Sequence, residues 1–253
     1  MARITRRDHC ACLVVRTKKG VPLVPNMHVE PQEQSAPGWK QVTRLVEELA
    51  GQGAAVFEPF AHMAWGDWLR VITLPPGIAL LGNVSQMRLY GSHLRRVPPA
   101  IGRMTSLQSL DVYTSYSLHW LPYEITRCGQ LKDSRMSTRA LYGNRKTRLP
   151  FPRLSRPIDL LVPSSCSVCD QPFDGRDPHL FWTTQRIGTD DVPLLIHSCS
   201  VTCTDAVPSA PPGFSNARTR AAAGSVCLPL RYVLCARGSL QDAAVLRNSR
   251  EGR

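Results

Sequence analysis

The stretch 74–144 reads LPPGIALLGNVSQMRLYGSHLRR (74–96), VPPAIGRMTSLQSLDVYTSYSLHW (97–120) and LPYEITRCGQLKDSRMSTRALYGN (121–144), three segments offset by 23 and then 24 residues. Each segment opens with an apolar residue followed by proline, and apolar residues return at matching places further along. A fixed period of this length is typical of a repeat architecture. The aligned positions are Leu74, Val97 and Leu121; Ile78, Ile101 and Ile125; Val84, Leu107 and Leu131; Met87, Leu110 and Ser134; and Leu89, Val112 and Met136.

This spacing follows the leucine-rich-repeat pattern, LxxLxL followed by a bend and a proline-led segment. Each unit would place a short strand on one sheet, with alternate apolar side chains pointing into a stacked core. A helical pair with coincidental periodicity is the alternative, but helix interiors reject proline, which recurs at the same place in all three units. The predicted fold class is α/β: a short leucine-rich-repeat solenoid with a helical N-terminal cap, followed by a small treble-clef-like zinc module.

Two features depart from this pattern. The position usually held by asparagine is occupied by Ser92, Ser115 and Arg139, and Ser134 stands where a core leucine is expected. The third unit is therefore predicted to be degenerate or terminal. Upstream, Val42, Leu45, Val46 and Leu49 recur at helical spacing, which predicts the helix of the N-terminal cap.

Alternation along the predicted strands leaves a set of polar and aromatic side chains on the concave, solvent-facing side. Tyrosine suits protein recognition because it combines contact area with a hydrogen-bonding group. The competing interpretation is that these are ordinary solvated strand residues. The predicted partner-binding residues are Arg88, Tyr90, Asp111, Tyr113 and Arg135.

Four of the nine cysteines form two close pairs, CSVC (166–169) and CSVTC (199–203), with 29 residues between them. A pair with two intervening residues suits a tight turn, and a pair with three suits the first turn of a helix, where positions i and i+4 share a face. Four such thiols match tetrahedral zinc and leave no position for water, so the site reads as structural. The predicted ligands of a structural Zn²⁺ are Cys166, Cys169, Cys199 and Cys203.

Other interpretations of the cysteines stay open at this point. His179 and His197 are substitute ligands, the thiols could carry no metal, and CSVC alone could serve a redox enzyme. Four thiolates around Zn²⁺ carry a net charge of −2, which Arg176, Arg186 or His197 could partly offset. Cys128 falls at an apolar position of the third unit and is predicted to lie in the core.

The repeats, followed by CSVCDQPF and then VPLLIHSCSVTC, resemble a family of intracellular leucine-rich-repeat-containing proteins with a C-terminal CxxC…CSxxC zinc-binding cap. The resemblance covers roughly residues 60–205. It implies interaction and scaffolding and no settled chemistry. Asp170 departs from the family's pattern, because such cysteine knuckles often carry glycine at this position.

Charge and hydropathy limit the classes of partner. The formal net charge is +12, with six Lys/Arg in residues 1–19, eight in 132–156 and seven in 204–253. These basic residues do not interleave with aromatic ones as a base-stacking surface requires, so nucleic-acid binding is not favoured. No apolar run approaches the ~20 residues of a membrane span, and the start lacks a secretory pattern. We therefore expect an intracellular, cytoplasmic protein without a membrane partner.

The predicted organisation has six parts, and no nucleotide-binding loop, nucleophile elbow or supported carboxylate pair indicates an enzyme. The predicted function is a non-enzymatic protein–protein interaction scaffold. The alternatives are an adaptor in a ubiquitin-type or signalling assembly, or a basic zinc-containing nucleic-acid-binding protein. The parts are an N-terminal extension (1–38), a helical cap (39–73), leucine-rich repeats (74–150), a Pro/Arg-rich linker (151–163), a four-cysteine zinc-binding cap (164–207) and a disordered tail (208–253).

Overall fold

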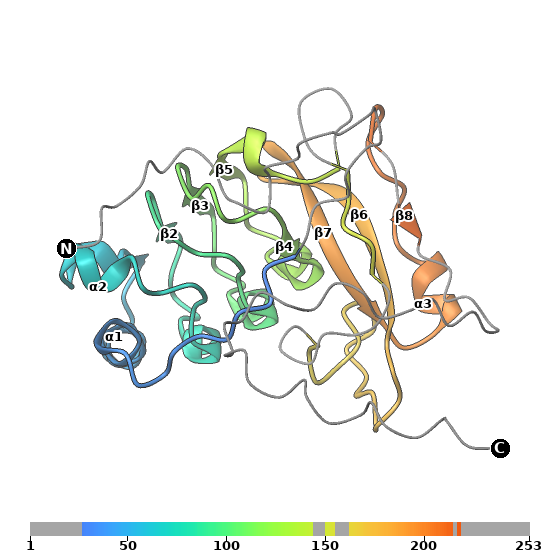
Figure 1. Ribbon diagram of the computed structural model, residues 1–253. Helices are drawn as coiled ribbons and strands as arrows, with labels where there is room; N and C mark the ends of the chain where they lie inside the picture. Colours follow the sequence, from blue (N-terminus) through green and yellow to red (C-terminus); the bar gives the residue numbers. More distant parts are fainter. Residues whose placement is uncertain (1–26, 144–149, 155–161, 215–216, 219–253) are drawn as a thin grey trace, which may run out of the picture. The chain divides into compact units, whose positions relative to one another are not determined.

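The computed structural model describes residues 27–143, 150–154, 162–214 and 217–218 (Figure 1). The predicted N-terminal extension up to residue 26, residues 155–161 of the predicted linker and nearly all of the predicted tail lie outside these residues. The elements are α1 (Pro37–Gln52), β1 (Val56–Phe57), η2 (Pro59–Ala61), α2 (Trp65–Trp68), η3 (Pro76–Leu80), β2 (Gln86–Arg88), η4 (Pro99–Arg103), β3 (Ser109–Val112), β4 (Leu121–Pro122), η5 (Tyr123–Arg127), β5 (Asp133–Met136), η6 (Thr138–Ala140), β6 (His179–Ile187), β7 (Asp190–Ser198), α3 (Val201–Asp205) and β8 (Ala217–Arg218).

Helix α1 confirms the helical periodicity read from the sequence. Proline stands at its first turn, where a missing N–H leaves no hydrogen bond unmade, and Gly53 ends it in the left-handed conformation with φ of 63°. The periodic residues Val42, Leu45, Val46 and Leu49 are all buried. Among the described residues, the structure contains no helix with the length and apolar character needed to cross a membrane.

Four short strands form a parallel sheet in the order β1-β2-β3-β5. Gln86 pairs with Ser109 and Ser109 with Asp133, so the register reproduces the 23- and 24-residue offsets of the sequence. The turns η3, η4 and η5 each follow a proline and lie side by side below these strands (Figure 1). Met87, Leu110 and Met136 point into the common core.

Serine side chains connect the bends that follow the strands. The Ser92 and Ser115 hydroxyls lie 2.7 Å apart, and the Ser115 hydroxyl also donates to the Leu89 carbonyl at 3.2 Å. In the next unit the Ser137 hydroxyl accepts from the Thr114 amide at 2.8 Å. Ser137, and not the exposed Arg139 that the alignment indicated, therefore continues the row.

A second four-stranded sheet has the order β4-β7-β6-β8. Strands β6 and β7 form an antiparallel hairpin from His179↔Ser198 to Ile187↔Asp190, and β4 pairs in parallel with β7 at Leu121↔Leu194. Strand β7 is buried on both faces. One face adds Val192 and Leu194 to the core of the parallel sheet, and the other packs Leu195 against Trp182.

Ser134 is where the tip of the hairpin meets the parallel sheet. Its hydroxyl, which has one hydrogen, lies 2.7 Å from the Ile187 carbonyl and 2.8 Å from the Asp190 carboxylate as alternative acceptors, and it accepts from the amides of Thr189 and Asp190 at 3.1 Å. A leucine here could make none of these bonds. The polar residue at a predicted core position thus marks a contact between the two sheets.

The predicted fold class is wrong. The described chain is a mixed α/β fold with few helices and two small sheets, in place of a leucine-rich-repeat solenoid followed by a small treble-clef-like module. The segment expected to begin a third repeat supplies β4 to the second sheet, and the cysteine-bearing hairpin shares its core with the parallel sheet. A sequence period predicts which successive segments stack on one another. It does not predict that one of them pairs with a strand about 70 residues further along the chain.

Candidate metal centre

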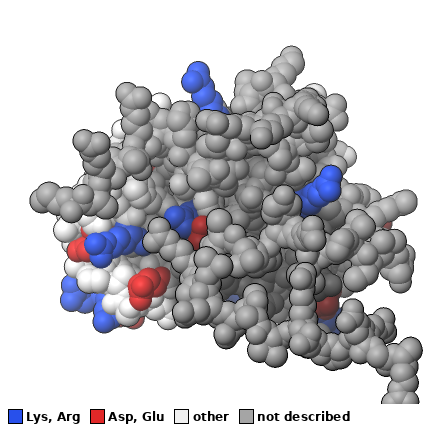
Figure 2. All heavy atoms as spheres, in the orientation of Figure 1, with Lys and Arg blue, Asp and Glu red and all other residues white. Residues whose placement is uncertain are grey.

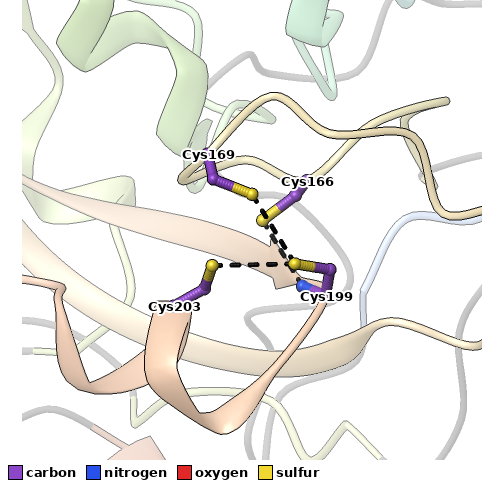
Figure 3. A group of neighbouring side chains, drawn as sticks. All are labelled: Cys166, Cys169, Cys199 and Cys203. Atoms are coloured by element: carbon purple, nitrogen blue, oxygen red, sulfur yellow. Dashed lines mark hydrogen bonds between the residues drawn. The ribbon is translucent and has the colours of Figure 1, made fainter.

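The first cysteine pair lies on a tight turn. The Cys166 amide donates to the Gln171 carbonyl at 2.8 Å, and the Asp170 amide donates to the Cys166 carbonyl at 3.0 Å. Asp170 adopts a φ of 61°, a left-handed conformation that glycine adopts more readily than other residues. These bonds fold the chain back so that Cys166 and Cys169 face the same side (Figure 3).

The second pair is positioned by a strand and a helix. Cys199 directly follows β7, and Cys203 lies in the first turn of α3, as the spacing predicted. Ser200 is the N-cap of this helix, and its hydroxyl accepts from the Cys203 amide at 3.1 Å. A capping hydroxyl fixes the direction in which a short helix starts, and here it turns the Cys203 thiol toward Cys199 (Figure 3).

The four sulfur atoms all lie within 4.8 Å of one another, and they could hold a metal ion. The Sγ atom of Cys199 is 3.6 Å from those of Cys169 and Cys203. Tetrahedral coordination with Zn–S bonds of about 2.3 Å separates the sulfurs by about 3.8 Å. The thiols therefore stand close to the separation that a tetrahedral ion requires.

Local electrostatics differ between the buried and the outer thiols. Burial opposes ionisation of Cys166, but amide hydrogen bonds from Cys169, Val168 and Cys199 outweigh it and lower the pKa of this thiol to about 7. At Cys199, the neighbouring thiols of Cys169 and Cys203 raise the pKa to about 12. A divalent cation among the sulfurs would reverse this second effect, because it stabilises every thiolate at once.

Arg127, at the end of η5, joins the first cysteine pair to the rest of the fold. Its guanidinium donates to the carbonyls of Cys166 and Ser167 at 3.2 and 3.0 Å and to the Asp170 carboxylate at 3.0 Å. Asp170 also accepts from the Ser165 hydroxyl at 2.9 Å, and these partners hold its pKa below the ordinary value. Sequence reasoning missed Arg127, and no spacing signal connects it to cysteines about 40 residues away.

Arg127→Ala is expected to weaken metal binding about tenfold, since outer residues that orient ligands commonly contribute at least this much. Competition with a chromophoric chelator measures the effect. The control is Arg103→Ala, which removes a 67% exposed arginine that reaches Asp170 only at 3.7 Å and should change affinity less than about twofold. Equal losses in the two variants would contradict a specific role for Arg127.

The side chains that the sequence suggested as substitute ligands or as charges offsetting the thiolates have other roles or other surroundings. Arg186 pairs with Asp191 at 2.7 Å, and Arg176 donates to the Phe173 carbonyl at 3.1 Å. His179 is exposed, and burial lowers the pKa of His197 to about 4, so its ring is neutral near pH 7. Neither histidine belongs to the metal-ligand cluster found among the described residues.

The predicted partner-binding residues come together on the exposed side of the parallel sheet. The Arg135 guanidinium lies 5.6 Å from the centre of the Tyr90 ring and 5.1 Å from that of Tyr113. Arg135 also pairs with Asp111 at 3.4 Å, and Arg88 pairs with Glu58 at 3.2 Å. The two tyrosine rings are 6.1 Å apart and are among the few exposed large hydrophobic residues of the described chain.

Cys128 is buried, as predicted, and lies outside the cluster; its thiol donates to the Ile101 carbonyl at 3.2 Å. Cys10, Cys12, Cys227 and Cys235 lie outside the described residues. Comparison of the chain with protein-family models gives no match, and no curated protein matches it in sequence. The resemblance to leucine-rich-repeat proteins with a zinc-binding cap therefore stays a prediction.

Proposed function

We propose that this protein is a non-enzymatic interaction scaffold that binds a protein partner through the exposed side of its parallel sheet. The observation that carries the proposal is the cluster of Tyr90, Tyr113 and Arg135, which we call the tyrosine–arginine face. Tyrosine and arginine are the residue types that contribute most often to the centres of protein interfaces. The two rings are held by a guanidinium already in place, so binding would order few new side chains.

The charges on this face favour a protein over a polyanion. Arg135 and Arg88 are each paired with an acidic residue of the same face, Asp111 and Glu58. Elsewhere, Figure 2 shows basic and acidic side chains next to one another around the first helices, where Arg44 pairs with Glu48. A nucleic-acid surface would instead present unpaired basic residues to phosphates.

We further propose that the metal of the four-cysteine cluster is Zn²⁺ and that its role is structural. Four thiolates in tetrahedral arrangement suit zinc, and they occupy every coordination position, so no water remains to react. The cluster joins the turn at Cys166, the end of β7 and the start of α3 (Figure 3). One ion would therefore tie the turn and the short helix α3 to the buried strand β7.

The double variant Tyr90→Ala/Tyr113→Ala is expected to weaken partner binding at least thirtyfold, because two central aromatic side chains are lost. A photo-crosslinking residue in place of Arg88 first captures and identifies the partner. The partner is then purified separately and titrated by calorimetry into the uncrosslinked wild-type and variant proteins. Leu80→Ala is the matched control, since Leu80 is 63% exposed on η3 and away from the strands. Undiminished affinity of the double variant would refute the proposed face.

A further inference from the structure

A cavity of about 230 Å³ is lined by none of the four cysteines and by no residue of the tyrosine–arginine face. Its walls come from the starts of η3 and η4, from β4 with the residue before it, from Trp39 of α1 and from the neutral ring of His197 in β7. The extended segment before α1 closes it with Gln32 and Gln34. Gln32 is held in place, because its side-chain oxygen accepts from the Ile72 amide at 2.8 Å.

Most of the cavity wall is apolar and rigid. Trp39 and Trp120 contribute aromatic surface, and five prolines contribute apolar rings. Each proline ring also fixes the backbone φ of its residue, which makes this wall rigid. Ligand sites of this kind combine apolar walls with a few placed polar groups. Cavities of about 300–1,000 Å³ hold drug-sized ligands, so a smaller molecule fits here.

Arg96 is the one permanently charged side chain among the described residues that line the cavity. It is only 6% exposed, and one Nη donates to the Glu30 carbonyl at 2.7 Å. The other Nη is buried and has no hydrogen-bond partner among the described residues. The nearby Glu30 carboxylate is already paired with Arg95 at 3.0 Å. A buried guanidinium with a free donor is costly unless an anion joins it.

We propose that this cavity binds a small organic carboxylate, with the carboxylate on Arg96 and an apolar body between Trp39 and Trp120. A carboxylate brings one negative charge to one guanidinium and matches its planar donors. A phosphate monoester would bring nearly two charges into a cavity that holds one positive charge. The inference is independent of the proposed scaffold function, since none of its residues belongs to the tyrosine–arginine face.

Phenylacetate and phenylacetamide have the same shape and differ in charge, so they test the proposal directly on the full chain. Titration followed by tryptophan fluorescence should show saturable phenylacetate binding at least tenfold tighter than amide binding, because a hydrogen-bonded charge is recognised. Equal affinity of acid and amide, or no saturation by either, would overturn it. Tighter binding of phenyl phosphate would overturn the assignment to carboxylates.

Arg96→Gln should reduce the preference for acid over amide to below about threefold, whereas Arg103→Gln removes a 67% exposed charge outside the cavity and should leave the preference intact. A preference that survives in R96Q contradicts the proposal. If R96Q does not fold, NMR of the wild-type chain decides: phenylacetate should shift the indole N–H signals of Trp39 and Trp120 and leave that of Trp65 unmoved. Shifts at Trp65 without shifts at the other two would refute the site.

Discussion

Cys166→Ser is expected to abolish zinc binding and to lower the free energy of unfolding by about 4 kcal/mol at a free zinc concentration a thousand times Kd. Cys166 is fully buried, and its sulfur accepts from the amides of Val168 and Cys199 at 3.4 and 3.3 Å. It is therefore the most deeply buried of the four ligands. A serine hydroxyl is a poor zinc ligand, so the linkage between metal binding and folding is lost.

Metal content by mass spectrometry and denaturant unfolding of the same sample measure this effect. Cys128→Ser is the matched control: it makes the same chemical change at another buried cysteine, where a hydroxyl can still donate to the Ile101 carbonyl. It should keep one zinc per chain and lose about 1–2 kcal/mol. Natively purified protein without zinc, or unchanged stability after chelation, would refute a structural metal.

Gly188→Ala is expected to lower the free energy of unfolding by about 3 kcal/mol, the second-largest effect. Gly188 has a φ of 57° at the tip of the β6–β7 hairpin. A Cβ there would lie 2.7 Å from the carbonyl carbon of Asp133 and from the amide nitrogen of Ser134. Both are backbone atoms of β5 and cannot move aside as a side chain could. The hairpin tip would have to move away from β5. This movement would break the hydrogen bonds that join the Ser134 hydroxyl to Ile187, Thr189 and Asp190.

Denaturant unfolding measures this loss, and amide exchange locates it, with faster exchange expected at Thr189 and Asp190. Gly175→Ala is the control, because Gly175 also has a positive φ, 77°, but nothing lies within 4 Å of its added Cβ. Gly175→Ala should lower the free energy of unfolding by only about 1 kcal/mol, the strain of an alanine held at a positive φ. Equal losses at the two glycines would show that contact with β5 contributes nothing.

The parts of the fold that the sequence predicted well rest on local or periodic relations. The spacing of Met87 and Leu110 reappears as a strand register, and the apolar positions of α1 are buried as a helical period requires. The metal-ligand cluster was predicted from two short spacings. In each case the backbone geometry of a few neighbouring residues decides which side chains share a face. The sequence pattern of those residues therefore predicts the shared face without the rest of the chain.

The parts that were missed are contacts between distant segments. Leu121 pairs with Leu194, Arg127 contacts Asp170, and Ser134 contacts Ile187, and no spacing or period connects the members of these pairs. The fold class was wrong for this reason, since β4 was assigned to a third repeat. Ser134 did give a signal, a polar residue at an apolar position, but only its contacts explain it.

The sequence by itself determined which residues form the parallel strands β2, β3 and β5, which side chains those strands expose, and which four thiols could meet, whereas β1 lies in the segment assigned to the helical cap. Only the tertiary structure decided that a hairpin completes the second sheet, that Arg127 holds the first cysteine pair, and that Arg96 lines a cavity between three turns. The physical reason is that the first group depends on backbone periodicity over a few residues. The second depends on how buried surfaces from remote segments fit together, which a linear pattern does not record.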